Sequence, residues 1–172
     1  MAVFSRDAIL KLIKEKKLKI SPFNKSQVGP GSVDLTLSNV FRVFIKTNSL
    51  LQIHDDTDYK PITKTVRVAK GSYLLMQPDE LVHGITVETV SLPENVSARI
   101  EGRSRFARMG LLTHVSSGFM QPGASGRIVL EIANLSPFAL AIHPGTRICQ
   151  IIFEDVKGSA KYTGKFKDQK KP

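Results

Sequence analysis

Apolar residues recur along most of the chain, and their spacing changes from helical near the start to strand-like afterwards. Near the N-terminus, Ile9, Leu12 and Ile13 follow a 3.6-residue period, which predicts an amphipathic helix running up to the segment EKKLK. Ser5 stands where a helix N-cap is expected, and Asp7 falls in the first turn. We therefore expect one N-terminal helix that lies across the rest of the fold.

The chain after this helix is predicted to form short β-strands. Runs rich in β-branched and aromatic residues occur at 40–45, 64–69, 72–77, 84–92, 96–101, 127–135 and 147–154. Proline and glycine residues typical of turns separate most of these runs. Many short strands without intervening helices favour a sandwich or jelly-roll barrel over an open parallel sheet. The pattern thus predicts a mainly β fold and leaves its topology open.

The strand predicted at 127–135 carries a single acidic residue. Its side chains alternate between two faces, with Ile128, Leu130 and Ile132 on one and Arg127, Val129 and Glu131 on the other. Burying a carboxylate costs free energy unless it is paired or functional, and burial raises its pKa toward the range useful for proton transfer. Glu131 is therefore a candidate general base. The alternative is an exposed or salt-bridged strand residue.

A dense polar cluster follows the strand predicted at 96–101. The segment EGRSRFARMG (101–110) places three arginines and a serine within six residues, namely Arg103, Ser104, Arg105 and Arg108. Arginine suits phosphate because its planar guanidinium group makes paired, charge-assisted hydrogen bonds. A phosphate site is one interpretation of the cluster. The other is a solvated basic turn, or arginines paired with Glu101 and Glu131.

The 172 residues and the apolar fraction of 41% are typical of one globular domain, 1–172. The net charge of +10 makes a phosphate-bearing partner the first electrostatic expectation. Residues 157–172 carry half of that charge, with six lysines and one aspartate. This tail also contains Tyr162 and Phe166 and is expected to be mobile when free. It is either a solubilising tail or a flexible arm that orders over a phosphate ligand.

Several classes of site lack their residues in this sequence. The single cysteine, Cys149, cannot form an internal disulfide or supply the cysteine pair of a zinc-dependent deaminase. The four histidines lie far apart, so no metal site is expected, although His114 stands between the two polar segments described above. P-loop, GxGxxG and GxSxG motifs do not occur. The single cysteine fits a reducing cytoplasm best.

No membrane association is expected from the hydrophobic pattern. No window approaches eighteen consecutive apolar residues, and the opening segment MAVFSRDAIL lacks the basic start and apolar run of a signal peptide. We therefore expect a protein that is neither exported nor inserted in a membrane.

Five motifs follow one another over nearly the whole chain. They are RDAILKLIKEKKLKISPF at 6–23, SVDLTL at 32–37, EGRSRFARMGLLTHVSSGFMQPGASGRIVLEIAN at 101–134, PGTRICQIIFE at 144–154 and KYTGKFKDQKKP at 161–172. In this order they resemble the dCTP deaminase family of the dUTPase-like superfamily. The resemblance implies a distorted jelly-roll or β-barrel of the dUTPase-like type with an N-terminal helix. It also implies a homotrimer with sites between subunits, in which residues 157–172 close over the nucleotide.

The same resemblance implies a reaction and its ligands. The activity would be hydrolytic deamination of dCTP to dUTP and ammonia in pyrimidine deoxynucleotide metabolism. A magnesium ion would bind through the substrate triphosphate, and no zinc would be needed. The nucleotides dCTP and dUTP are the implied partners, dTTP is a candidate inhibitor, and nucleic acid is not an expected partner.

Site residues follow from the resemblance position by position. Glu131 matches the catalytic glutamate, which takes a proton from the attacking water. Ser104 and Arg108 match residues that position this water and polarise the base, and Arg103 matches a phosphate contact. The other implied nucleotide contacts are the backbone around Ser117, Val129 and Leu130 and the side chains of Gln150, Tyr162, Lys165 and Gln169.

Three positions depart from the family pattern. Arg105 stands where a second serine is common, Gln121 replaces an aspartate before Pro-Gly, and Phe166 replaces a tyrosine. Arg105 either adds a phosphate contact or intrudes on one. Gln121 argues against cleavage of dUTP, because the corresponding acid in dUTPase-type relatives helps to hold the sugar and the hydrolytic water.

Two alternatives to a deaminase stay open from the sequence alone. One is a bifunctional dCTP deaminase/dUTP diphosphatase, or a dUTPase. The other is a non-catalytic nucleotide-binding or single-strand-binding β-barrel that uses the basic tail and its aromatic residues.

Overall fold

The computed structural model describes residues 2–48, 50–164, 166 and 168–172. Helical segments are α1 (Arg6–Lys14), η1 (Lys25–Gln27), η2 (Lys60–Ile62) and α2 (Ser104–Ala107). The strands are β1 (Lys19–Ser21), β2 (Val33–Thr36), β3 (Val40–Phe44), β4 (Thr63–Arg67), β5 (Leu74–Met76), β6 (Leu81–Ser91), β7 (Val96–Gly102), β8 (Leu111–Thr113), β9 (Phe119–Met120), β10 (Ser125–Asn134), β11 (Leu140–Ile142) and β12 (Arg147–Asp155). The prediction of a mainly β fold with an N-terminal helix is confirmed. No helix in the described part of the chain is long and apolar enough to cross a membrane.

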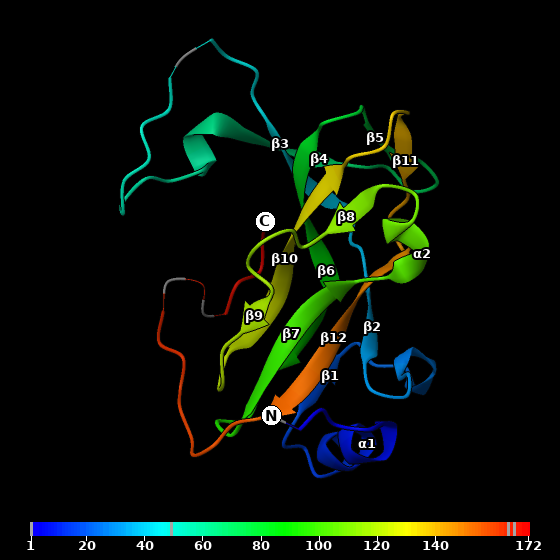
Figure 1. The fold of residues 1–172 in the computed structure, drawn as a ribbon, viewed down its shortest axis with the longest axis vertical. Helices are drawn as coiled ribbons and strands as arrows, with labels where there is room; N and C mark the ends of the chain where they lie inside the picture. Colours follow the sequence, from blue (N-terminus) through cyan, green and yellow to red (C-terminus); the bar gives the residue numbers. More distant parts are fainter. Residues whose placement is uncertain (1, 49, 165, 167) are drawn as a thin grey trace.

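The strands form two main antiparallel sheets and a small one (Figure 1). One sheet has the order β4-β3-β6-β10-β8, with β1 also paired to β6, and another has the order β2-β12-β7-β9. Strands β11 and β5 form the third. Helix α1 lies at one end of the molecule, beside β1 and the end of β12 (Figure 1). Sequence-distant strands therefore meet in each sheet, and β10 comes to lie between β6 and β8.

The core is built from the apolar faces of these sheets. Strand β10 contributes Leu130 and Ile132, which are fully buried, while β3 and β12 contribute Phe41 and Phe153. Burial of each such side chain stabilises the fold by roughly 1.5–3 kcal/mol. The alternation predicted for 127–135 is confirmed at these positions, since Arg127, Val129 and Glu131 remain only partly buried. The face of β10 that carries Glu131 is thus left free to form a site.

A β-bulge in β6 interrupts its pairing with β10 just before this face. Arg127 pairs with Thr89 and Val129 pairs with Ile85, so the extra residues of β6 lie opposite Ile128. The Ile128 amide donates to the Thr86 hydroxyl at 3.0 Å, and the Arg127 Nε donates to the Thr86 carbonyl at 2.6 Å. The bulged part of β6 therefore has defined hydrogen-bond partners on β10.

A carboxylate in the interior joins the two main sheets. Glu88 on β6 is 2% exposed and accepts hydrogen bonds from the Gln27 side chain at 2.7 Å and from the Thr36 amide at 2.8 Å. Buried carboxylates require such donors because desolvation is otherwise too costly. Glu88 thereby ties η1 and β2 to the central strand β6.

The described residues of the tail, 157–164, 166 and 168–172, run back along the molecule beside β9 and β10 (Figure 1). The Tyr162 amide donates to the Pro122 carbonyl at 3.0 Å, and the Asp168 amide donates to the Ser125 carbonyl at 2.8 Å. The Arg127 amide in turn donates to the Gln169 carbonyl at 2.8 Å, within a parallel bridge between Gly126 and Gln169. The tail is therefore held by the backbone of the segment that leads into β10.

The N-terminal helix has the predicted extent and differs from its prediction at the cap. It ends at Lys14, directly before the segment EKKLK. Ser5 occupies the N-cap position, but its side chain makes no capping hydrogen bond. The first free amide is satisfied otherwise, because Arg6 N donates to the Pro30 carbonyl at 2.7 Å.

Candidate active site

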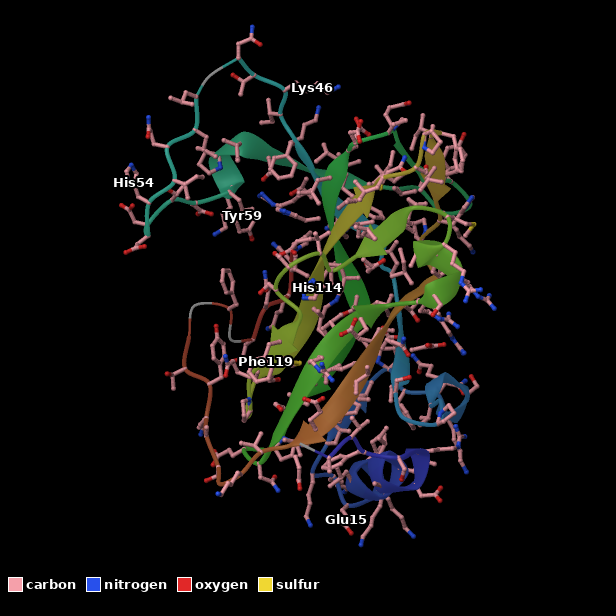
Figure 2. All side chains as sticks on the ribbon, in the orientation of Figure 1. Glu15, Lys46, His54, Tyr59, His114 and Phe119 are labelled. Carbon is pink, nitrogen blue, oxygen red and sulfur yellow. The ribbon has the colours of Figure 1, made fainter. Side chains whose placement is uncertain are left out.

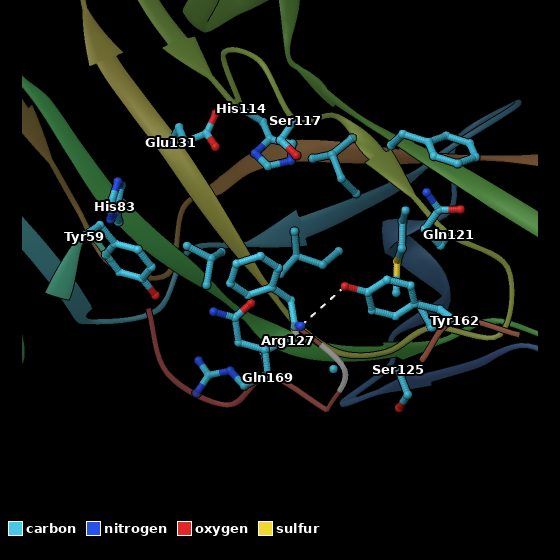
Figure 3. Close-up of a pocket in the computed structure, with 18 of the residues that line it drawn as sticks. Tyr59, His83, His114, Ser117, Gln121, Ser125, Arg127, Glu131, Tyr162 and Gln169 are labelled. Carbon is cyan, nitrogen blue, oxygen red and sulfur yellow. Dashed lines mark hydrogen bonds between the residues drawn. The ribbon is translucent and has the colours of Figure 1, made fainter. Parts of the chain in front are cut away.

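A cavity of about 540 Å³ opens between β10 and the tail (Figure 3). Residues of β10 from Ser125 to Glu131 form one wall, except for the buried Leu130. Tyr162, Phe166 and Gln169 of the tail form another, and the Phe166 amide donates to the Tyr162 hydroxyl at 3.3 Å. The cavity is large enough for a nucleotide-sized ligand.

Glu131 presents its carboxylate at the wall of this cavity. The Oε2 atom accepts hydrogen bonds from the Ser116 amide at 3.2 Å and from the Ser116 hydroxyl at 3.3 Å. The side chain also borders a second cavity of about 470 Å³, whose lining includes Asp79 and Glu80. Glu131 is therefore neither in the core nor free in solvent, and its carboxylate can reach a molecule bound in the larger cavity.

Two histidines flank Glu131. His114 follows β8, and its amide donates to the Glu131 carbonyl at 2.6 Å with a left-handed φ of 63°. Burial lowers the pKa of His114 below 6.5, against the opposing effects of Glu131, a hydrogen bond with the Ser117 backbone, and Glu101. Burial also lowers the pKa of His83 on β6, while Glu131 raises it and Arg42 lowers it. Both imidazoles are therefore uncharged at neutral pH.

Six of the site residues expected from the sequence line the larger cavity. They are Ser117, Gln121, Val129, Glu131, Tyr162 and Gln169. The expected backbone contact at Leu130 lies in the same strand, although the side chain of this residue is fully buried in the core. Lys165 lies outside the described residues. Strand β10, the β8–β9 loop, the β9–β10 loop and the tail thus bring these residues together from four parts of the chain.

The arginine cluster does not line this cavity. Ser104 and Arg105 on α2, and Arg108 directly after it, are exposed. In Figure 1, α2 lies beyond β8, on the side of the molecule away from the tail. Within one chain, the structure therefore does not assemble Ser104 and Arg108 with Glu131.

Arg103 and Gln150 have structural partners instead of facing the cavity. The Arg103 guanidinium lies 3.2 Å from the Asp34 carboxylate and donates to the Arg147 carbonyl at 2.7 Å. Gln150 accepts from the Ser32 hydroxyl at 2.8 Å and donates to the Gly102 carbonyl at 3.2 Å. The alternative in which the arginines pair with Glu101 and Glu131 is wrong for Arg103, because Asp34 is the acid that β2 brings next to it.

Several cavity residues were not expected from the sequence. Tyr59, His83, Phe119 and Arg127 all line it. His83 could have been found from the strand register, because it pairs directly with Glu131. Tyr59 comes from the long segment between β3 and β4, which has no strand pattern, so no local signal placed it near β6.

The protein side chains offer little to a metal ion. The described residues contain no group of three or more histidine, cysteine, aspartate or glutamate side chains that could hold one. Among the described residues lining the larger cavity, Glu131 is the only acid and Arg127 the only arginine or lysine.

Comparisons with known proteins agree with the motifs. A family model described as dCTP deaminase-like matches residues 3–156. The chain is 38% identical over 156 residues to a dCTP deaminase, dUMP-forming, of Methanosphaera stadtmanae, covering 90% of this chain and 79% of the relative. It is 34% identical over 181 residues to the protein of the same name in Methanobrevibacter smithii, covering 100% and 93%.

Solved structures show the same fold. A 2'-deoxycytidine 5'-triphosphate deaminase from Agrobacterium tumefaciens matches with a TM-score of 0.69 at 22% identity, over 89% of this chain and 48% of that one. A mutant dUTPase of Staphylococcus bacteriophage 80alpha matches with a TM-score of 0.52 at 13% identity, over 86% and 96%. The dUTPase-like fold class is thereby confirmed. Since the family model spans most of the chain and the relatives above 30% identity cover it almost entirely, the chain belongs to the dCTP deaminase-like family.

Proposed function

We propose that the protein hydrolytically deaminates dCTP, with Glu131 as the general base. The observation that carries this proposal is the position of the Glu131 carboxylate at the wall of a nucleotide-sized cavity, in a chain of the dCTP deaminase-like family. The names of the relatives, which state dCTP deaminase, support the substrate.

The proposed chemistry needs a carboxylate that both takes and returns protons. Water attacks the amine-bearing carbon of the cytosine ring while Glu131 accepts one of its protons. Glu131 passes this proton to the N3 atom of the ring, then takes the second proton from the new hydroxyl group and gives it to the amine as the C–N bond breaks, so that dCTP and water yield dUTP and ammonia. The two hydrogen bonds from Ser116 orient Oε2, and the uncharged His83 and His114 do not hold the proton at neutral pH. General acid–base catalysis of this kind contributes about 100-fold to 10,000-fold in rate.

A second copy of the chain completes this site in our proposal. Ser104 and Arg108 are exposed and lie outside the cavity of their own chain. Large apolar side chains are exposed nearby, including Val115 and Phe119 after β8 and Leu135 after β10. Covering such a surface with another copy would remove it from water and could bring Ser104 and Arg108 to the neighbour's Glu131. We propose that this assembly is the homotrimer that the family resemblance implies.

The tail and β10 would hold the nucleotide. Tyr162 and Gln169 face the cavity from the tail, and the Arg127 guanidinium faces it from β10. The lysines of residues 157–172 would add positive charge for the triphosphate and its magnesium ion. When bound, that ion would neutralise part of the phosphate charge. Closure of the tail would exclude bulk water from the reacting ring.

The test is ammonium release from dCTP in the presence of magnesium. Glu131→Gln keeps the size of the side chain and should lower kcat at least about 100-fold. Glu15→Gln is a matched control, because Glu15 lies at the end of the molecule that carries α1, away from His114 (Figure 2), and its carboxylate pairs with Lys17 at 2.8 Å. Turnover of Glu131→Gln at the wild-type rate would show that Glu131 is not the general base.

A second candidate activity is cleavage of the triphosphate at the same site. The relatives are named dUMP-forming, whereas the resemblance had implied dUTP as the product. Against this, Gln121 lines the cavity where an aspartate is common in the family. The names favour a bifunctional enzyme, and the glutamine favours a deaminase that stops at dUTP.

Following ammonium and pyrophosphate together distinguishes these two activities. A bifunctional enzyme releases both from dCTP in equal amounts, while a pure deaminase releases ammonium alone. Gln121→Asp restores the acid, and Gln121→Asn is its uncharged control. Pyrophosphate that appears only in Gln121→Asp would identify the missing carboxylate as the reason for the single activity.

A further inference from the structure

Three polar side chains form a row across the strands β3, β6 and β10. Arg42 on β3 pairs with His83 on β6, and His83 pairs with Glu131 on β10. Directly opposed residues of antiparallel strands point to the same face, with their Cβ atoms about 4.5–5.5 Å apart. His83 therefore stands between a permanent cation and the proposed catalytic carboxylate.

Aromatic rings fix the His83 side chain in this row. The Phe44 ring lies 5.4 Å from it at 73°, and the Tyr59 ring lies 5.3 Å from it at 83°, both edge to face. The Nδ1 atom is buried and has no hydrogen-bond partner among the described residues. His83 also borders both of the cavities that Glu131 borders. The imidazole is thus held in a partly apolar position beside Glu131, with an unused polar atom.

We propose that His83 is a positioning residue for Glu131. As the pH falls, His83 binds the first proton that the pair takes up, and its positive charge keeps the Glu131 carboxylate ionised. This inference rests on the proposed function, since it concerns the base of that reaction. The proton comes from solvent and resides on the imidazole, so no bond other than N–H is formed. Glu131 then remains able to accept a proton from the attacking water below neutral pH.

The electrostatic surroundings support this order of protonation. Burial lowers the pKa of His83, and Arg42 lowers it further, but the Glu131 charge raises it. The effect is reciprocal, so a charged His83 favours the ionised form of Glu131. The other titratable groups around His83 are the Tyr59 phenol, from the segment before β4, and Asp79 and Glu80, which line the second cavity with it.

The first test follows the protonation of His83 without any substrate. Histidine-labelled protein is titrated by NMR, as wild type and as Glu131→Gln. We expect the His83 midpoint to move to lower pH in Glu131→Gln, because the neighbouring negative charge is lost. The exposed His54 and His143 are internal controls and should not move. An unchanged His83 midpoint would overturn the proposal.

The second test uses the pH profile of kcat/KM for dCTP. In His83→Gln, Glu131 should become protonated at a higher pH than in the wild type. The ratio of variant to wild-type kcat/KM should therefore be about two- to threefold lower at about pH 5 than at about pH 8. His83→Phe keeps a ring between Phe44 and Tyr59, and its kcat/KM should show the same pH dependence as that of His83→Gln. His54→Gln, in an exposed segment, should give a ratio that does not vary with pH.

The outcomes separate the two proposals. A ratio that is reduced equally at every pH would show a structural role for His83 and would refute the inference. Absence of dCTP turnover in the wild type would refute the proposed function instead. The NMR titration would still decide whether His83 and Glu131 share their protons.

Discussion

Gly126→Ala tests whether the tail is held over the cavity as the structure shows. Gly126 has a φ of +149°, and a Cβ built on it would lie 2.8 Å from the Gln169 amide nitrogen and 3.1 Å from the Gln169 carbonyl oxygen. Real Cβ atoms are not found this close to backbone atoms. Neither group can rotate away, because both are main chain. The tail must therefore move outward in the variant.

The cost of this movement follows from the hydrogen bonds that it breaks. The Asp168 amide and the Arg127 amide each lose a partner across this contact. At about 0.5–1.5 kcal/mol for each bond, the docked tail becomes less stable by about 1–3 kcal/mol. This corresponds to a decrease of roughly fivefold to 150-fold in the docked-to-free ratio. Since Tyr162 and Gln169 reach the cavity only from the docked tail, KM for dCTP should rise by up to the same factor.

Amide hydrogen exchange at Arg127 and Asp168 measures the effect directly. Both amides should exchange faster in Gly126→Ala by the factor given above. Gly145→Ala is the matched control, because Gly145 also has a positive φ of +88° but has open space around its added Cβ. It carries similar backbone strain without touching the tail. Equal protection of Arg127 in Gly126→Ala and wild type would refute the docked position of the tail.

Three further predictions concern stability and reactivity. Glu88→Ala removes the acceptor of the Thr36 amide and one of the two acceptors of the Gln27 side-chain amide, which keeps the Asp34 carbonyl. The free energy of unfolding in urea should therefore fall by about 1–3 kcal/mol, against almost no change for Glu15→Ala. Burial lowers the pKa of His83 and His114 below the unfolded value, so the unfolded chain binds more protons in that range. The contribution of these two histidines to stability is complete above pH 6.5 and is lost as the pH falls. The midpoint temperature of unfolding should therefore vary less between about pH 7.5 and pH 5 in the double variant His83→Gln/His114→Gln than in the wild type. Burial raises the pKa of the Cys149 thiol far above neutrality, so mass spectrometry should detect alkylation by iodoacetamide only after unfolding.

The longer strands could be predicted because their patterns are local. Strands β6, β7, β10 and β12 have enough residues for alternation or β-branched runs to appear, and each was found at its predicted position. The two-residue strand β9 and the three-residue strands β1, β8 and β11 were not predicted, since so few residues define no period. Their existence depends on partners that are distant in the sequence.

The site was predictable where it rests on one strand and not where distant segments meet. Glu131 could be singled out because it is the only acid among the apolar residues of its strand. The arginine cluster, by contrast, looked uniform in the sequence, but only Arg103 finds an internal carboxylate, Asp34. Tyr59 and Gln169 reach the cavity through long connections, whose course is set by tertiary contacts rather than by any repeat in the chain.

The irregular pairing opposite Ile128 divides β10 into two halves. The half before it receives the tail through Ser125 and Arg127, and the half after it presents Glu131. Because the extra residues lie on β6, the alternation of side chains along β10 continues without interruption from Arg127 to Glu131. Deleting one residue between Ile128 and Glu131 would therefore turn that acid toward the interior while the tail contact stayed in place. One continuous face of a single strand thus has to serve both the grip on the nucleotide and the proton transfer.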